Sequence, residues 1–210
     1  MGLFNSILTS LGRSATSAVA GKIAGKAIEK SVNQKVDEIK KTAGSFSRTF
    51  TFQELPTTLE AFKALPEATL VDMYAVAALS LVALTRYEAD RDTAIAMLNY
   101  LKGPEELSNL EIQNLNDRFM DGKFYKVNSF FGGATPENNY TPSQPFTVEV
   151  SSNAYSFENE GWAVLYLKSG GADNPRPVRL RMKPSTSQWF LVEIQYLGDI
   201  RQPVASNKWA

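Results

Sequence analysis

Two short clusters of charged residues are the parts of this sequence in which acid–base chemistry would be placed. The first spans Arg86–Asp92 and the second spans Asp117–Asp121. Carboxylates at such spacing can hold Mg²⁺ or act as acid and base, while a neighbouring arginine binds an anionic group. Charges at a turn between helices are also typical of helix caps and surface ion pairs, and Asp90 suits the N-cap of a following helix. We expect the structural role for both clusters.

The amino-acid composition excludes several classes of catalytic site. The 210 residues include no histidine and no cysteine. Zinc and copper sites are built mainly from imidazole and thiolate ligands, so we expect no such metal site and no cofactor. Ser-His-Asp and Cys-His mechanisms are excluded outright. We therefore expect a protein that is not an enzyme, since any catalysis would have to use carboxylates, lysine, arginine or tyrosine.

The overall charge gives no support for a nucleic-acid partner. Basic and acidic residues both number 22, so the net charge is zero. A nucleic-acid-binding protein usually carries a basic surplus or a broad basic patch. The alternating arginines of Arg176–Arg181 are therefore expected to lie on the solvated face of a strand, where they also discourage edge-to-edge pairing.

Three features of the sequence bear on the location of the protein. The absence of cysteine fits a reducing cytoplasm. The first twelve residues have helix spacing rather than the continuous apolar core of a signal peptide. The most apolar run, Leu70–Leu84, has 15 residues and contains Asp72, whereas a spanning helix needs about 20 apolar residues. We expect a cytoplasmic protein, with peripheral membrane association as an alternative.

Residues 1–44 have the pattern of a long amphipathic helix. Apolar side chains recur every three to five positions from Phe4 to Ile39, which places them on one stripe. Seven basic and three acidic residues give this segment a net charge of +4, so the rest of the neutral chain carries −4. Gly44, preceded by Lys40 and Lys41, suits the C-terminal end of a helix.

A second face of this predicted helix consists of small residues: Ser17, Ala20, Gly21, Ala24 and Gly25. Glycine inside a helix costs about 1 kcal/mol relative to alanine, so two glycines require an offsetting interaction. Close approach of another helix backbone supplies one. We expect this face to pack against a second copy of the helix or against a partner protein. The alternatives are packing on the chain's own domain, binding to a membrane surface and a disordered arm.

After Gly44 the sequence predicts helices first and strands later, as in an α+β domain. Residues 45–53 alternate aromatic side chains, as a short strand or an extended linker does. Helical patterns then start at Thr57, Ala68, Asp90 and Ser108. Thr57 with Glu60 and Ser108 with Glu111 have the spacing of capping boxes. Strand-like runs follow at Phe146–Val150, Gly161–Lys168, Val178–Met182 and Trp189–Tyr196. We expect a helical part over residues 45–135 and a small antiparallel β-sheet over 136–210 of the same domain.

A stretch rich in glycine, proline and asparagine joins the predicted helices to the predicted strands. Its candidate binding residues are Phe130, Phe131, Asn138, Asn139 and Tyr140. Exposed groups of these types bind a sugar or a peptide by stacking and neutral hydrogen bonds. The alternative, which we favour, is a structural crossover held by its prolines.

Five distinctive strings occur between Tyr74 and the C-terminus: Ala78–Tyr87, Met97–Pro104, Asp117–Lys123, Ala134–Pro142 and Lys183–Thr186. Together they resemble an uncharacterised bacterial protein family of unknown function. The resemblance covers roughly the last 135 residues. It implies a bacterial origin but carries over no activity and no site residue, and the N-terminal helix lies outside it.

From these observations we expect a non-enzymatic interaction or structural protein. It would form a homo-oligomer, or dock on a partner, through the N-terminal helix. One alternative is a peripheral membrane protein that uses the basic amphipathic helix. Another is a carboxylate-dependent enzyme that uses one of the two charged clusters, through the following residues: Glu88, Asp90 and Asp92, or Asp117 and Asp121.

Overall fold

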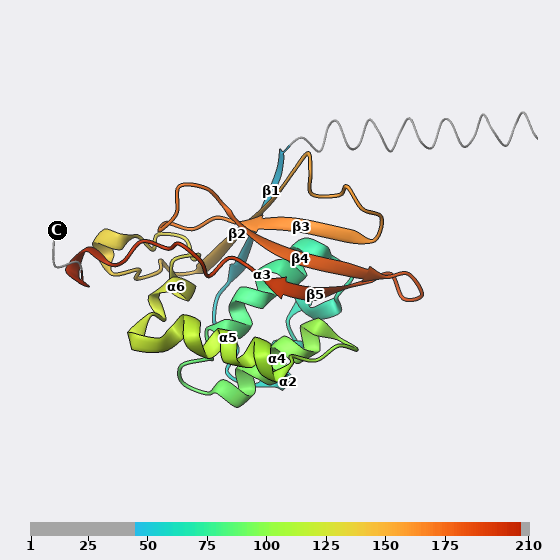
Figure 1. The fold of residues 1–210 in the computed structure, drawn as a ribbon, viewed down its shortest axis with the longest axis horizontal. Coiled ribbons are helices and arrows are strands. Elements are labelled where there is room, and N and C mark those ends of the chain that lie inside the picture. Colours follow the sequence, from blue (N-terminus) through green and yellow to red (C-terminus); the bar gives the residue numbers. More distant parts are fainter. Residues whose placement is uncertain (1–44, 207–210) are drawn as a thin grey trace, which may run out of the picture. The chain divides into compact units, whose positions relative to one another are not determined.

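The computed structural model describes residues 45–206. The predicted helix of residues 1–44 lies outside the described residues, and so does its small-residue face at Ser17, Ala20, Gly21, Ala24 and Gly25. The described part is an α+β domain with five α-helices and one five-stranded antiparallel sheet. Figure 1 shows the elements in chain order.

The strands lie in the sheet in the order in which they occur in the chain. Their bounds are β1 Ser45–Phe52, β2 Phe146–Asn153, β3 Trp162–Leu167, β4 Arg176–Lys183 and β5 Gln188–Ile194. The aromatic segment after Gly44 is thus a strand and not a linker. It pairs with β2 along its whole length, from Ser45 opposite Asn153 to Phe52 opposite Phe146. One strand of the sheet therefore comes before the helices.

The helices occupy the chain between β1 and β2. They are α2 Leu59–Lys63, α3 Met73–Leu84, α4 Arg91–Lys102, α5 Asn109–Phe119 and α6 Tyr125–Asn128. Short 3₁₀ turns are η1 Pro66–Thr69, η2 Met120–Gly122, η3 Pro136–Asn138 and η4 Val204–Ser206. Two predicted starts are confirmed, because Asp90 caps α4 and Ser108 forms a capping box with Glu111. The cap of α2 is Thr58 instead of Thr57, since the extended Thr58 accepts the Ala61 N–H.

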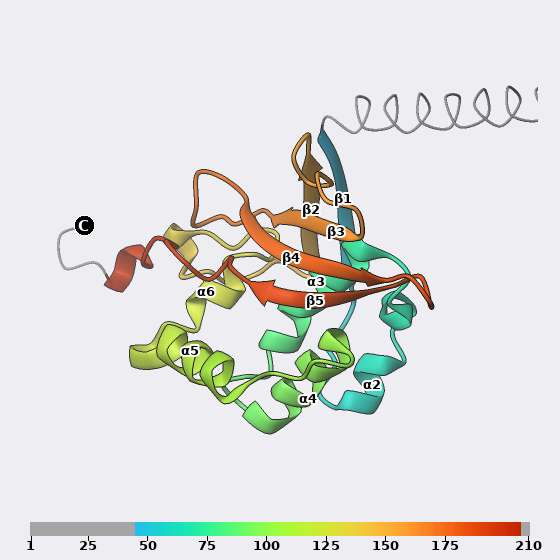
Figure 2. The ribbon, with the colours of Figure 1, turned by 45° about the vertical axis from the view of Figure 1, so that its right-hand side comes forward.

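Helix α3 is the centre of the core. It contacts all five strands, and every residue from Ala75 to Leu84 is buried. A helix that is apolar on all sides must be covered on all sides. Here the five strands pack on one side of α3, and α4 and the 3₁₀ turn η1 pack elsewhere on it (Figure 2). Its one buried hydroxyl, Ser80 Oγ, donates to Ala77 O at 2.7 Å and lies 3.1 Å from Tyr196 Oη.

Candidate functional site

A groove of about 630 Å³ lies between helix α5 and strand β5. One wall comes from α5, and the other comes from β5 and the segment that follows it. Its apolar lining consists of Leu107, Leu115, Leu191, Val192, Ile194 and Leu197. Charged side chains from three elements complete the groove: Lys102 of α4, Glu111, Asp117 and Arg118 of α5, and Glu193 of β5. The groove therefore combines apolar surface with charged side chains, and it is the candidate binding site of the described domain.

The base of the groove holds a lysine that is almost completely buried. Lys102 is only 7% exposed, and its Nζ donates to Glu111 Oε1 at 2.9 Å and to Val192 O at 3.2 Å. Gly103, which follows it, ends α4 with a φ of +67°, and an added Cβ would lie 2.3 Å from the Phe190 ring. Glycine therefore lets the end of α4 approach β5 closely enough for Lys102 to reach the strand.

Glu111 connects this lysine to the start of α5. Its Oε2 accepts the N–H and the hydroxyl of Ser108, at 2.8 and 2.7 Å. Burial by itself would raise the pKa of Glu111, but the hydrogen bonds from Lys102 and Ser108 outweigh it and lower the pKa below its ordinary value. The carboxylate and the ammonium thus satisfy each other. What the groove offers to a ligand is apolar surface and the rim charges.

The residues of the second charged cluster, Asp117–Asp121, lie in two different surroundings. Asp117 and Arg118 lie exposed at the rim of the groove. Asp121 instead forms an exposed ion pair with Lys123, with 3.1 Å between the two groups. Only part of this cluster therefore faces the groove.

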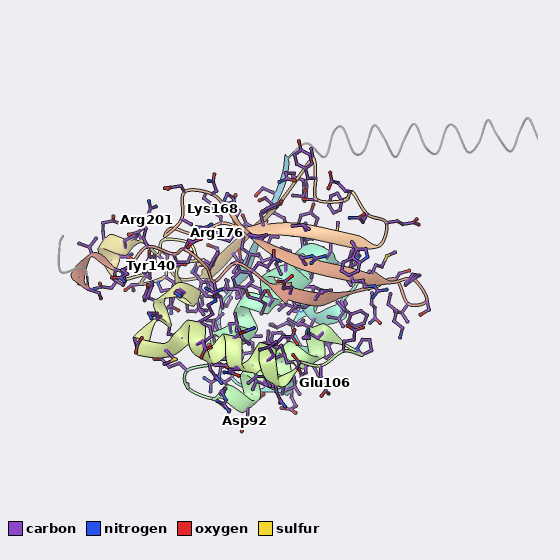
Figure 3. All side chains as sticks on the ribbon, viewed as in Figure 1. Asp92, Glu106, Tyr140, Lys168, Arg176 and Arg201 are labelled. Carbon is purple, nitrogen blue, oxygen red and sulfur yellow. The ribbon has the colours of Figure 1, made fainter. Side chains whose placement is uncertain are left out.

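The first charged cluster is a helix start. Asp90 accepts the N–H and the hydroxyl of Thr93, at 3.1 and 2.7 Å, and these hydrogen bonds lower its pKa. Glu88 and Asp92 are exposed, and Figure 3 shows Asp92 at the margin of the helical layer. Within residues 45–206, no three acidic side chains are grouped closely enough to hold a metal ion.

A family match covers most of the domain. Residues 54–204 match a protein family described as a domain of unknown function, DUF6935. The chain belongs to this family. The match confirms the resemblance to an uncharacterised family and carries it back from Tyr74 to Glu54. Neither a curated protein nor a solved structure matches the chain.

All the helices of this DUF6935 domain, and β2 to β5, fall within the matched residues, whereas β1 precedes them. The groove between α5 and β5 is therefore part of the family domain. Among the described residues, no helix combines the length and the apolar character needed to cross a membrane.

The aromatic residues of the candidate binding loop lie inside the core of the DUF6935 domain. Phe130, Phe131 and Tyr140 are all buried, so the expectation of an exposed Tyr140 is wrong. The Tyr140 ring stacks on Tyr125 with centroids 5.5 Å apart, and its hydroxyl donates to Arg201 O at 2.7 Å. Burial raises the pKa of Tyr140 to about 12. An added Cβ at Gly171 would lie 2.3 Å from the Tyr140 hydroxyl, so glycine there makes room for the ring.

Asn138 holds the loop together from within. Its Oδ1 accepts the N–H groups of Thr135 and Thr141, at 2.9 and 3.2 Å. Its Nδ2 donates to Gly133 O at 2.8 Å and to Thr141 O at 3.1 Å. Asn139 is exposed and has a φ of +55°. Four of the five candidate residues are thus either buried in the core or hydrogen-bonded within the loop. This favours the structural crossover over an exposed binding loop.

Sequence reasoning missed Lys102 and the groove. Lys102 looks like an ordinary basic residue in the last turn of a helix, where it suits the helix dipole. Glu111 was identified only as half of a capping box. No local pattern links the two residues to Val192, which is 90 positions from Lys102, so only the folded chain brings them together.

Proposed function

We propose that this chain is a non-enzymatic bacterial interaction protein that self-assembles, or docks on a partner protein, through residues 1–44. The observation that carries this proposal is the small-residue face of the predicted helix, where Gly21 and Gly25 need a neighbouring backbone to offset their cost.

The chemistry of the groove supports binding over catalysis. The Lys102 ammonium is occupied by Glu111 and Val192 O, so it is poorly placed to act as a nucleophile or a base. In the charged clusters, Asp90 is a cap and Asp121 is paired with Lys123. We propose that the groove is a secondary binding surface of the same interaction protein.

Light scattering on the full chain tests the helix-mediated assembly. The double variant Gly21→Leu/Gly25→Leu fills the small-residue face, and we expect it to lower the average mass at micromolar concentration. Ala15→Leu adds a similar side chain on the apolar stripe of the predicted helix, away from the small-residue face, and serves as the control. Equal masses for the wild type and both variants would show that the face does not mediate assembly.

The basic amphipathic pattern of residues 1–44 favours a second candidate, a cytoplasmic protein that binds membrane surfaces peripherally. Co-sedimentation with vesicles that contain an anionic lipid separates the two. We expect Lys22→Ala/Lys26→Ala to weaken vesicle binding if this candidate is right, and the double glycine variant to leave it intact. No binding at low salt would exclude it.

A further inference from the structure

The two edges of the sheet differ in how they are protected. At the β5 edge, the Trp189 N–H donates to Leu70 O at 2.7 Å, and Lys102 Nζ donates to Val192 O. The pairing of β5 with β4 is also irregular between Arg179 and Leu180. Covering loops, an inward-pointing charge and a bulge are the devices by which proteins block strand addition at an edge. The β5 edge therefore carries three of them.

The outward-facing backbone groups of β1 can be identified from its neighbour. The Lys168 N–H donates to Glu149 O at 3.1 Å, so the backbone of Glu149 faces β3. Opposite residues in an antiparallel pair point their backbone groups either toward or away from each other. Thr49, opposite Glu149, therefore points away from β2, and by alternation so do Ser47 and Thr51.

These outward groups are unprotected. Within residues 45–206, no hydrogen bond reaches the backbone N–H or C=O of Ser47, Thr49 or Thr51. The strand contains neither proline nor glycine, and its register with β2 has no irregularity over eight residues. A long, regular, unpaired edge is a template for another strand.

We propose that β1 pairs antiparallel with β1 of a second copy of this chain, which joins two five-stranded sheets into one. Thr49 lies on the two-fold axis, since it is the outward-facing residue nearest the middle of the strand. Ser47 then faces the partner's Thr51, and each outward pair exchanges two hydrogen bonds, about six in all.

The strand is complementary to itself in this register. Arg48 is opposite the partner's Phe50, so no two like charges face each other. Its guanidinium pairs with Asp72 and lies over the Phe50 ring of its own strand, 4.6 Å from the centroid. Phe46, which is 50% exposed, is opposite the partner's Phe52, whose ring is buried in its own domain. Hydroxyl pairs and aromatic pairs are favourable cross-strand neighbours, which makes a second copy the fitting occupant.

This interface goes beyond the helix-mediated assembly proposed above and does not require it, because all of its residues belong to the described domain. To keep the two apart, its test uses the full chain carrying Gly21→Leu/Gly25→Leu. Loss of helix-mediated assembly in that background leaves pairing through β1 measurable by itself.

The decisive experiment is a charge swap at the two-fold axis, read by sedimentation velocity. Thr49→Lys brings two ammonium groups together and Thr49→Glu two carboxylates, so each variant alone should dimerise up to about 5-fold more weakly, while an equimolar mixture should recover dimers. Recovery in the mixture cannot come from misfolded chains. Thr186→Lys, in the turn between β4 and β5, is the matched control and should dimerise as its parent does. Swap variants that dimerise like that control would overturn the proposal.

Amide hydrogen exchange gives a second readout on the unmodified full chain. We expect the N–H groups of Ser47, Thr49 and Thr51 to exchange more slowly as protein concentration rises. Fast exchange at every concentration would mean that the edge stays free. Slow exchange at concentrations where sedimentation shows a monomer would mean that something other than a second copy pairs with it. Either result would refute the β1 interface without bearing on the helix-mediated assembly.

Discussion

Replacing the buried lysine of the groove is the sharpest test of how the domain is held together. Lys102→Met removes the ammonium and keeps an unbranched side chain of similar length. It deletes the hydrogen bonds to Glu111 Oε1, at 2.9 Å, and to Val192 O, at 3.2 Å. The surrounding packing is otherwise preserved, so the change in stability reports on these two contacts.

The expected loss of unfolding free energy is about 2 kcal/mol. The Val192 carbonyl loses a donor at the base of the groove, and an unsatisfied acceptor costs about 1–3 kcal/mol. Glu111 is 39% exposed, so water can replace the lysine, and this half of the loss is worth under about 1 kcal/mol. For a domain of this size, 2 kcal/mol corresponds to a fall in Tm of about 4–8 °C.

Urea unfolding followed by tryptophan fluorescence measures this loss. Lys168→Met is the matched control, because Lys168 is 67% exposed and forms a surface ion pair with Glu149, and its loss should cost under about 1 kcal/mol. Glu111→Gln in the Lys102→Met background should have a smaller effect than in the wild type. If Lys102→Met is no more destabilising than Lys168→Met, the buried contacts do not stabilise the domain and the reasoning fails.

Three further predictions concern acid stability, alkaline stability and backbone geometry. The pKa of Glu111 is lowered in the folded state from its ordinary 4.5. The stability that the ionised Glu111 gives to the fold is therefore fully present above pH 4.5 and is lost as the pH falls through the lowered pKa. Urea midpoints should therefore drop more in the wild type than in Glu111→Gln between about pH 5 and pH 3. The pKa of Tyr140 is raised from 10.0 to about 12, so stability should fall as the pH rises above 10, because the unfolded chain ionises first. Tyr140→Phe should reduce this alkaline loss without abolishing it, because burial raises the pKa of Tyr196 as well. It should cost about 1 kcal/mol at neutral pH for the hydrogen bond to Arg201 O, and an unchanged alkaline profile would contradict the assignment. Gly103→Ala should destabilise the domain by more than Gly122→Ala, since both glycines have φ near +68° but only at Gly103 would a Cβ meet a side chain, at 2.3 Å from Phe190. Equal thermal shifts for the two variants would show that the contact with Phe190 is unimportant.

Local signals account for most of the secondary structure that the sequence predicted. The Ser108–Glu111 capping box and the Asp90 cap need only residues three positions apart. The strands after residue 145 also show in the pattern of residue types. The first and last residues of the helices were less well predicted. The helical pattern starts at Ala68, but α3 begins at Met73. The reason is that Pro66–Thr69 forms a separate 3₁₀ turn and that Leu70, with a φ of +64°, interrupts the helical backbone.

Burial in the crossover loop was not predictable from composition. Phe130, Phe131 and Tyr140 lie among residues typical of an exposed loop, yet all three are buried. Gly171 leaves room for the Tyr140 ring, and the carbonyl of Arg201 accepts the hydrogen bond of the Tyr140 hydroxyl. Both residues are distant from Tyr140 in the sequence. A ring is recognised as buried only when the elements that cover it are in place.

The sequence by itself determined the absence of histidine and cysteine chemistry, the helix caps and the α+β class, because each depends on composition or on neighbouring residues. Only the tertiary structure decided that the strand at Ser45–Phe52 joins the sheet through β2, about a hundred residues later, and that no other strand among residues 45–206 pairs with its outer edge. It alone also placed Lys102 beside Glu111 and Val192. Both arrangements are hydrogen bonds between groups far apart in the sequence. Which of these groups meet depends on how the whole chain packs around its core, so no local sequence pattern can predict them.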